Sequence, residues 1–304
     1  MIDLAALRSL DAISVQGSVV AAAAALGYTP SAVSQQVKKL ERQTGLPLLE
    51  RAGRGVLLTE HGRLLVTQGK ALLADLEHLE ATLAAGSSLV RGTLRVAAFS
   101  TSVRGLVAPA VRVAAAEQPE LALTIVEVDP WESIDLVGSG QVDVAVVHNW
   151  ARVPLVIPER LAEHHLMTDV ADLLVHRDSP LATRESVTPR DLAGQHWIST
   201  PERTICHEWL LRMYDGTGLA PDVRHWSGEF ASHVVLVAEG AGISLNPRLG
   251  RGLLPDDVVP VPVVDPVPRR EVRVVWRRTM SSSPAIGYVA DLLTRLSCGQ
   301  RAIS

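Results

Sequence analysis

The chain has 304 residues, of which 47% are apolar, and a formal net charge of −4 at pH 7. This length is too great for one small domain and suits two or three compact units, each with its own core. The negative net charge argues against a protein that coats nucleic acid along its whole surface. The two cysteines, Cys206 and Cys298, provide neither a disulfide framework nor zinc-ligand spacing, and they suit a reducing compartment.

The N-terminal segment contains Asp3 and Asp11 and has no basic stretch that leads into an apolar core. We therefore expect no signal peptide. No apolar run approaches the length that spans a membrane, and the ten histidines show no metal-ligand spacing. These features predict a cytoplasmic protein with no membrane partner, no metal and no cofactor.

A tight turn joins two predicted helices near the N-terminus. Val19–Leu26 is an unbroken run of apolar and small residues, and Gly27 can take the left-handed conformation that ends a helix. Thr29 and Pro30 are residue types favoured at an N-cap and at the first helical position. A second helix thus starts after two or three residues, which predicts helix-turn-helix geometry.

The second helix, Pro30 to about Thr44, has two distinct faces at 100° per residue. Its apolar stripe contains Val33, Val37 and Leu40. Its polar stripe contains Ser31, Gln35, Lys38 and Arg42, with Ser34 at the edge. Such side chains can pair with base edges and phosphates, so we interpret this face as one that reads a DNA groove. The alternative is an ordinary solvated face, which would normally carry more glutamate.

A small basic hairpin is predicted over Leu48–Thr59. Apolar strand positions flank the loop Arg51-Ala52-Gly53-Arg54-Gly55, whose two glycines allow a tight turn. Arg51 and Arg54 at its tip can lie along phosphates. The alternative is a plain surface turn, in which these two arginines would have no role.

Residues 1–62 resemble the winged helix-turn-helix of LysR-type transcriptional regulators. The matching motifs are AAAALGYTPSAVSQQVKKLERQTGLPLLER and GVLLTEHGRLL. The resemblance implies that the chain binds double-stranded DNA at an operator. It assigns the DNA contacts to Ser31, Ser34, Gln35 and Lys38 in the helix and to Arg51 and Arg54 in the wing. One departure is Leu49, where the family usually has phenylalanine, and it concerns only local packing.

The distribution of charge agrees with one localised DNA-binding face. Residues 30–63 hold six Lys or Arg against three acids, whereas residues 92–304 hold 20 against 25. A basic patch on an acidic body favours one defined contact surface.

One long helix is predicted from Glu60 to about Ala85. Leucines at 65, 72 and 79 and at 76 and 83 form an a/d seam. A partner chain is the natural cover for this seam, although an intrachain core helix is the alternative. The family resemblance also implies a homodimer through this helix, and we expect a homotetramer as the larger assembly. Two linked wings would read a two-fold-related operator.

The remainder alternates between strand and helix patterns. The first segments are Thr93–Phe99, Val103–Glu117, Leu121–Val128, Ile134–Val137 and Val142–Val147, which read as βαβαβ with parallel strands. Strand-like segments recur at Val170–Val175, His196–Ser199, Val223–Trp226, Val234–Glu239, Ile243–Leu245 and Val272–Trp276. A last helix is predicted from Pro284 to about Leu296. The predicted fold class is therefore α/β with an all-α-plus-wing N-terminal domain.

This body resembles the effector-binding region of the same family, which is similar to periplasmic solute-binding proteins. The matching segments are GTLRVAAFS, GQVDVAVV and EGAGISLNP. The resemblance implies a DNA-binding domain over 1–59, a linker helix and hinge over 60–91, and an effector domain over 92–304. It further implies one lobe of 92–162 plus 269–304 and another of 163–268, with a small-molecule effector in the cleft between them.

Ligands of open α/β sheets lie beyond the carboxyl ends of the parallel strands. Ser100, Thr101 and Ser102 follow the first strand, where their hydroxyls can hold a carboxylate or phosphate, although simple helix capping is the alternative. The other candidates follow later strands or precede a helix: Trp131, His148, Asn149, Ser199, Thr200 and Phe230. Each aromatic residue taken singly is also a candidate for ordinary packing.

Two other functions compete with a ligand-responsive regulator. Cys206 could make the protein redox-responsive, since some family members sense peroxide through cysteines, but those use a pair close in sequence. A hydrolase could be assembled on paper from Ser100, His148 and Asp129. No GxSxG motif supports it, and it gives residues 18–62 no role. We therefore expect no enzyme and no catalytic residues.

Overall fold

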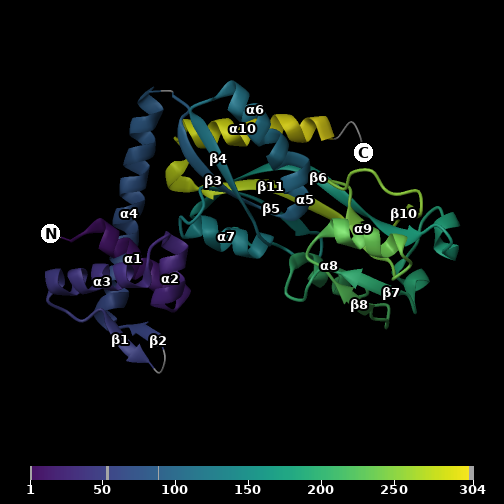
Figure 1. The fold of residues 1–304 in the computed structure, drawn as a ribbon, viewed down its shortest axis with the longest axis horizontal. Helices are drawn as coiled ribbons and strands as arrows, with labels where there is room; N and C mark the ends of the chain where they lie inside the picture. The colour runs from purple at the N-terminus through teal and green to yellow at the C-terminus, as the bar shows by residue number, and fades with distance from the viewer. Residues whose placement is uncertain (1, 53–54, 88, 301–304) are drawn as a thin grey trace. The chain divides into compact units, whose positions relative to one another are not determined.

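The computed structural model describes residues 2–52, 55–87 and 89–300. The chain forms two compact units, the first built on residues 1–88 and the second on most of the remainder. The elements of both units are drawn in Figure 1.

The first unit contains four helices and a hairpin. They are α1 (Leu4–Gln16), α2 (Val19–Leu26), α3 (Pro30–Thr44), β1 (Leu49–Ala52), β2 (Gly55–Leu58) and α4 (Glu60–Ser87). The predicted turn is confirmed: Gly27 has φ +67°, and the Thr29 hydroxyl accepts a hydrogen bond from the Ala32 amide. One core joins the helices and the hairpin, with Leu10, Ala22, Val37, Leu48 and Val66 among its buried residues.

A glycine lets α4 approach α1 closely. A Cβ atom at Gly69 would lie 2.6 Å from Cδ1 of Leu7, a separation that packed side chains do not adopt. The long helix is therefore fixed to the helix-turn-helix core at its N-terminal end. Beyond that end its leucine seam is open in the single chain. Leu72, Leu79 and Leu83 are 52%, 53% and 69% exposed, and Leu65 and Leu76 are half-buried.

The second unit is built on a seven-stranded sheet in the order β10-β6-β11-β5-β3-β4, with β9 also paired to β6. The strands are β3 (Gly92–Ala98), β4 (Leu121–Glu127), β5 (Val144–Trp150), β6 (Leu161–His176), β9 (Ser244–Pro247), β10 (Val258–Pro262) and β11 (Arg269–Arg277). β3 runs parallel to β4 and β5, as predicted, and β11 is antiparallel to β5 and β6. The predicted α/β class is confirmed.

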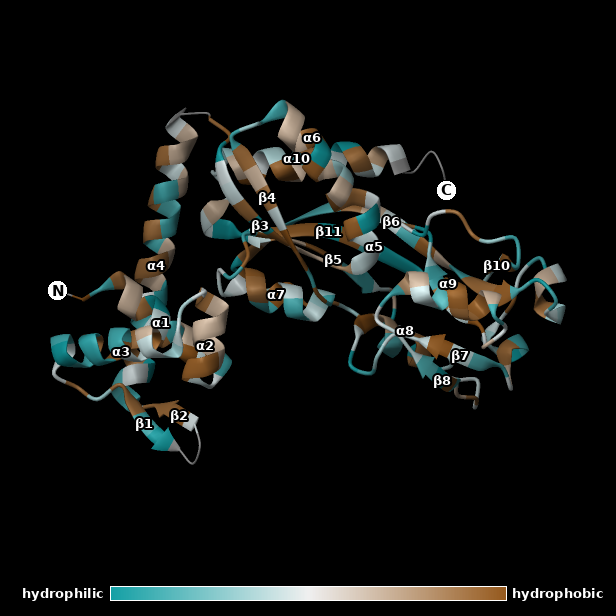
Figure 2. Ribbon diagram, viewed as in Figure 1, coloured by the Kyte–Doolittle hydropathy of each residue, from teal (hydrophilic) through white to brown (hydrophobic). Residues whose placement is uncertain are grey.

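Helices cover both faces of this sheet. α6 (Ala108–Glu117) and α10 (Pro284–Gln300) pack together on one face, and α7 (Pro130–Gly138) packs on β3, β5 and β11 from the other (Figure 1). The short α5 (Ser100–Ser102) and a π-helical turn (Val103–Val107) lead into α6. The core strands are strongly apolar (Figure 2), and residues such as Val96, Ala145 and Val274 are completely buried.

A second, smaller sheet lies beside the far half of β6. It consists of the parallel strands β7 (His196–Ser199) and β8 (Asp222–Trp226), with α8 (Ile205–Met213) and α9 (Phe230–Ala238) packed around it. The long strand β6 belongs to both regions, since its first half pairs with β11 and its second half pairs with β9 and β10.

Three sequence predictions are wrong in detail. Val234–Glu239 belongs mainly to helix α9, because a short apolar run does not by itself distinguish a strand from a buried helix. The strand predicted over Val170–Val175 is only the second half of β6. His148 and Asn149 lie within β5 and not beyond its end, because pairing with β11 extends the strand to Trp150.

Candidate nucleic-acid interface and ligand cavity

The polar face of α3 is open to solvent. Ser31, Gln35 and Lys38 are exposed, and Ser34 is half-buried. Among the described residues, none of these four side chains has a protein hydrogen-bond partner. The helix is predominantly hydrophilic (Figure 2), whereas Val33, Val37 and Leu40 on its opposite face are buried. This arrangement leaves the predicted DNA contacts free to meet a ligand.

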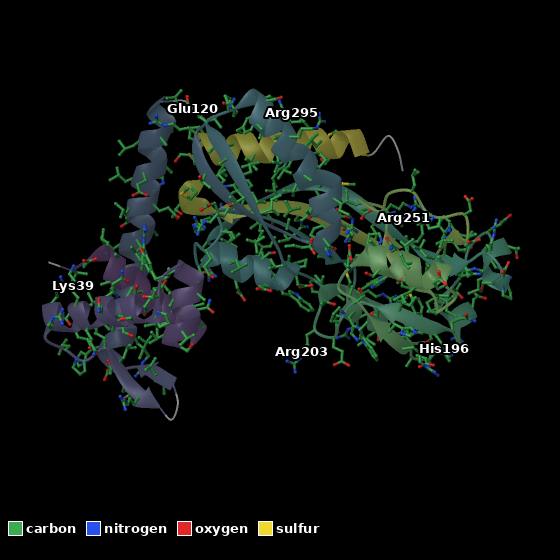
Figure 3. All side chains as sticks on the ribbon, viewed as in Figure 1. Lys39, Glu120, His196, Arg203, Arg251 and Arg295 are labelled. Carbon is green, nitrogen blue, oxygen red and sulfur yellow. The ribbon has the colours of Figure 1, made fainter. Side chains whose placement is uncertain are left out.

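The cations on α3 are not equivalent. Lys39, which is labelled in Figure 3, forms an ion pair with Asp3 at the start of α1. Lys38 is exposed and forms no such pair among the described residues. Glu41 accepts a hydrogen bond from the Leu48 amide at 2.9 Å and so ties the end of α3 to the start of the hairpin.

The hairpin carries one of the two predicted wing arginines within the described residues. Arg51 pairs with Val56 in the β1–β2 register, and its side chain is exposed. Arg54 lies outside the described residues. The Thr59 hydroxyl donates to the Pro47 carbonyl at 2.8 Å and accepts from the Gly62 amide at 3.0 Å, which fixes the base of the hairpin.

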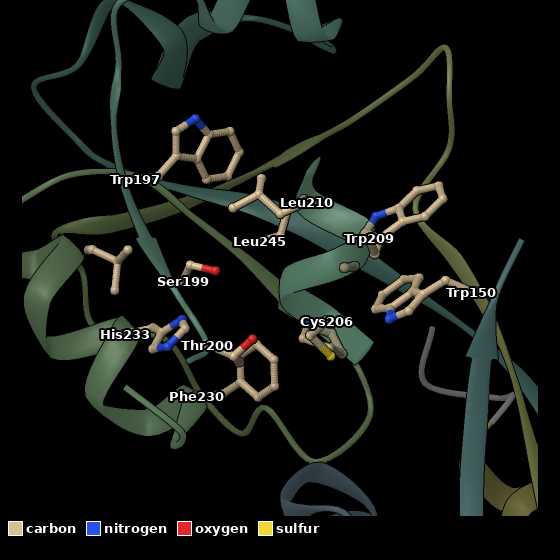
Figure 4. A pocket seen from close by; sticks show the side chains of 13 residues that line it. Trp150, Trp197, Ser199, Thr200, Cys206, Trp209, Leu210, Phe230, His233 and Leu245 are labelled. Carbon is tan, nitrogen blue, oxygen red and sulfur yellow. The ribbon is translucent and has the colours of Figure 1, made fainter. Parts of the chain in front are cut away.

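The second unit contains a small, partly open cavity of about 20 Å³. This volume is sufficient for roughly one water molecule. Figure 4 shows the stacked rings of Trp150 and Trp209 on one side and Phe230 and His233 on the other. The lining residues are Trp150, Ala171, Trp197, Ile198, Ser199, Thr200, Cys206, Trp209, Leu210, Phe230, His233, Leu245 and Pro247.

The cavity walls carry no formal charge at neutral pH. The Ser199 hydroxyl lies 3.0 Å from His207 Nδ1, and the Thr200 hydroxyl lies 2.7 Å from the Thr204 hydroxyl. His233 bonds to Ser244 and to the Ser227 carbonyl, and burial lowers the pKa of its imidazole below 6.5. The hydroxyl and imidazole groups of the lining are therefore neutral and already positioned by protein partners, whereas the indole N–H groups of Trp150 and Trp209 have no acceptor in the described part of the chain.

A charged network is buried next to this cavity. Arg270 is completely inaccessible, and its guanidinium donates to Asp169 Oδ2 at 2.7 and 2.9 Å and to the Thr101 hydroxyl at 2.7 Å. Its Nη1 has no acceptor in the described part of the chain. Arg270 also lies 4.9 Å from the ring centre of Phe99. The network joins the first turn after β3 to strands β6 and β11.

This network changes the roles expected of the hydroxyls after β3. The Thr101 hydroxyl accepts a hydrogen bond from Arg270, and the Ser102 hydroxyl donates to the Phe99 carbonyl at 2.8 Å. Only the Ser100 hydroxyl is without a partner among the described residues. The expected trio of anion-binding hydroxyls is thus reduced to one.

The nine predicted effector-binding residues separate into two groups. Ser199, Thr200 and Phe230 line the cavity. The other six do not: Ser100, Thr101, Ser102, Trp131, His148 and Asn149. Trp131 is 36% exposed, and the Asn149 side chain accepts from the Glu271 amide at 3.2 Å. His148 is buried between Phe99 and Trp150, and burial, aided by the charge of Arg270, lowers its pKa well below 6.5.

Sequence reasoning missed several cavity residues, among them Trp197, Trp209 and His233. Trp209 stacks on Trp150 with ring centres 5.4 Å apart. The scarcity of aromatic residues, 4% of the chain, is the one signal in the sequence that could have drawn attention to Trp197 and Trp209.

Cys206 lies at the edge of the cavity with its sulfur 3.9 Å from His148 Nε2. Burial raises the pKa of its thiol to about 11, and the nearby charge of Arg270 only partly opposes this effect. The thiolate is the nucleophilic form of cysteine. The environment of Cys206 therefore suppresses the form that reacts with oxidants.

Family models cover most of the chain. Residues 4–63 match the bacterial regulatory helix-turn-helix protein, lysR family, and residues 87–297 match the LysR substrate binding domain. The chain belongs to the LysR family of transcriptional regulators. The predicted family and the predicted DNA-binding function are confirmed, and the polar face of α3 lies in the domain that the family uses to bind DNA.

Curated relatives align with most of this LysR-type regulator. The small neutral protease regulatory protein of Streptomyces coelicolor is 33% identical over 245 residues, which are 79% of this chain and 71% of that protein. The hydrogen peroxide-inducible genes activator of Pectobacterium carotovorum subsp. carotovorum is 26% identical over 247 residues, 81% of this chain and 80% of that protein.

Solved structures share the fold. A full-length OxyR variant from Pseudomonas aeruginosa has a TM-score of 0.70 at 22% identity, covering 97% of this chain and 98% of that one. Full-length CbnR in complex with its target DNA has a TM-score of 0.54 at 18% identity, covering 97% and 99%. Within the part of the chain that the structure describes, no single helix is long and apolar enough to cross a membrane; only α1 and α2 taken together, bent by 120°, reach that length and composition.

Proposed function

We propose that this LysR-type regulator reads a two-fold-related operator through the open polar face of α3. Ser31, Ser34, Gln35 and Lys38 would contact base edges and backbone in the major groove, while Arg51 and Arg54 would lie on phosphates. The observation that carries this proposal is the division of α3 into a buried apolar face and a polar face with no protein partners within the described residues. A purely structural helix face would be expected to use such groups in local hydrogen bonds or ion pairs, as Lys39 does.

We further propose that the domain of residues 1–59 is paired with a second copy through the linker helix and hinge of residues 60–91. Leu72, Leu79 and Leu83 form an exposed apolar stripe on α4, and water contact with such a stripe is unfavourable. A two-helix seam would bury it and would present two α3 helices to successive half-sites. A homotetramer is the larger assembly that we expect.

The effector domain would bind its ligand between a lobe of residues 92–162 and 269–304 and a lobe of residues 163–268. One contact across these segments is a hydrogen bond from the Ile205 amide to Asp129 Oδ2 at 3.2 Å. The cavity beside it holds roughly one water molecule, so the lobes would have to separate before a larger molecule entered. An effector would then change DNA binding only through its different affinity for the two arrangements.

The cavity favours an uncharged, flat effector. Its walls combine tryptophan and phenylalanine rings with the neutral hydroxyls of Ser199 and Thr200, and none of the described residues places a guanidinium or ammonium group in the lining. Burying an unpaired carboxylate there would be strongly unfavourable. The carboxylate-bearing effector suggested by Ser100–Ser102 is therefore the weaker of the two proposals.

A redox-responsive regulator is the second candidate function. Similarity to hydrogen peroxide-inducible genes activators favours it, whereas the raised pKa of Cys206 opposes it. We propose no enzymatic activity. The carboxylate of Asp129 accepts from the amides of Trp131 and Ile205, and no bond joins it to His148 within the described chain, as a hydrolytic triad would require.

The operator proposal is tested with DNA sequences selected from a random pool by the full-length protein. Gln35→Ala should lower the preference for selected over random DNA by about 5- to 150-fold, since a good base contact contributes roughly 1–3 kcal/mol of discrimination. Gln43→Ala is the matched control, because Gln43 lies on the same helix but accepts a hydrogen bond from the Asp3 amide. An equal loss of preference in both variants would contradict the assignment.

The effector proposal is tested by thermal-shift screening of uncharged aromatic compounds against aromatic carboxylates of the same size. Stabilisation by the uncharged set, lost in Ser199→Val but retained in Ser100→Ala, is the expected result. A response to the carboxylates alone, lost in Ser100→Ala, would support the anion site after β3 instead.

A further inference from the structure

A second hollow is lined by strands β6 and β10, the π-helical turn that leads into α6 and the loop after β9. It is an open groove of about 870 Å³. Ala171 and Pro247 line the cavity, whereas the residues that follow them, Asp172 and Arg248, line the groove. The cavity and the groove have no lining residue in common. A ligand in the groove would therefore not occupy the effector cavity.

Arginine side chains converge on this groove. Arg248 makes a two-pronged ion pair with Asp172, with Nε–Oδ2 and Nη2–Oδ1 distances of 2.9 and 2.8 Å. Arg251 donates from Nη1 to the same carboxylate at 2.8 Å. Arg104 lines the groove from the helix side, and its Nε donates to the Gly250 carbonyl at 2.9 Å. Figure 3 labels Arg251 on the loop that carries two of these side chains.

The carboxylates in the groove do not balance these charges. Asp172 is 3% exposed and forms ion pairs with both Arg248 and Arg251. Asp169, the other acidic residue of the lining, is held by the buried Arg270. The three lining arginines against the two lining aspartates leave a net formal charge of +1, and the buried Arg270 already neutralises one of these aspartates. An excess of positive charge in a hollow attracts and concentrates anions.

Donor groups remain available on all three lining arginines. Within the described residues, no acceptor engages Nη1 of Arg248, Nε and Nη2 of Arg251, or either terminal nitrogen of Arg104. Arg251 is held in place, with 15% of its side chain exposed, so its free N–H groups lose little freedom when a ligand binds. Fixed guanidinium groups with spare donors match the geometry of carboxylate and phosphate oxygens.

We propose that this groove is a binding site for a compact polyanion, in which a phosphate group or two or more carboxylates meet Arg104, Arg248 and Arg251. Such a ligand would link the helix that follows β3 to the loop that follows β9. It would favour the arrangement of the second unit in which these two segments face each other, and so would act on the lobes from outside the cavity. The site does not depend on what the effector cavity binds.

The full-length protein is titrated with citrate and, separately, with inorganic phosphate by calorimetry at constant ionic strength. Arg104→Gln should weaken binding of at least one of these anions about tenfold, because it removes a charged donor without taking a partner from Asp172. Arg112→Gln is the matched control, since Arg112 is exposed on α6, outside the groove. The double variant Arg104→Gln/Arg251→Gln should weaken binding further.

Preference for citrate would identify a polycarboxylate site, and preference for phosphate would identify a phosphoryl site. Two results would overturn the proposal: neither anion binds at 10 mM, or Arg104→Gln and Arg112→Gln weaken binding equally, as non-specific charge effects would. Phosphate that binds only to the polar face of α3 would also show no difference between the two variants, because neither substitution changes α3. Circular dichroism of each variant without ligand verifies that the fold is retained.

Discussion

Replacement of Leu79 on α4 should weaken the dimer in a measurable way. Leu79 is 53% exposed in the single chain. Complete burial of a leucine contributes about 1.5–3 kcal/mol, so covering the exposed half contributes about 1 kcal/mol. A two-fold dimer contains two copies, and Leu79→Ala should therefore cost about 2 kcal/mol, which is roughly a 30-fold increase in the dimer dissociation constant. Alanine retains the helix because it has the highest helix propensity.

The measurement is mass photometry over a nanomolar dilution series, with Leu79→Asp as a stronger second variant. Leu64→Ala is the matched control, because Leu64 is 60% exposed on the same helix but lies about 100° around it from Leu65. Dissociation constants that rise equally for Leu79→Ala and Leu64→Ala, or that stay at the wild-type value in both, would refute a seam through Leu72, Leu79 and Leu83.

Three further predictions concern the second unit. His148 is buried with its pKa well below 6.5, so the unfolded chain takes up a proton that the folded protein excludes. Stability should be full above pH 6.5 and fall at up to about 1.4 kcal/mol per pH unit below it, and His148→Asn should flatten this slope in denaturant titrations between pH 7.5 and 5.5; an unchanged slope contradicts the assignment. Because its pKa is raised from 9.0 to about 11, the Cys206 thiol should contain about 100-fold less thiolate at pH 7.5 than an unperturbed thiol. It should therefore react with iodoacetamide far more slowly than the exposed Cys298; equal rates by mass spectrometry would revive the redox alternative. Arg270→Met should lower the free energy of unfolding by about 3–5 kcal/mol, because it leaves the carboxylate of Asp169 buried without its cationic partner. Adding Asp169→Asn should recover part of this loss. No recovery would show that lost packing, and not the unpaired charge, causes the destabilisation.

The features that the sequence predicted well depend on neighbours in the chain. Gly27, Thr29 and Pro30 define the turn before α3 within four residues, and the apolar positions of α3 repeat with the period of one helix. The long helix α4 has the same local character. Each of these signals is complete within one or two elements, so no knowledge of the tertiary fold is needed to interpret it.

The features that the sequence predicted poorly depend on pairing between distant strands. β5 continues through His148 because β11 lies beside it, and β11 is more than a hundred residues further along the chain. The irregularity between Val272 and Arg273 shifts the register of β11 against β6. A one-residue shift of this kind exchanges the faces of a strand, so no periodicity argument could have placed Arg270 beside Asp169.

The amino-acid sequence by itself determined that this is a DNA-binding protein with a long helix and an α/β domain, because caps, turns and helical periodicity act over short distances. Only the tertiary structure decided which side chains share a cavity and which share a groove. Ala171 and Asp172 are neighbours in the chain, yet they face an uncharged aromatic cavity and an arginine-lined groove respectively. That division follows from segments distant in the chain, such as those of Arg104 and Arg251, which meet only when the sheet forms.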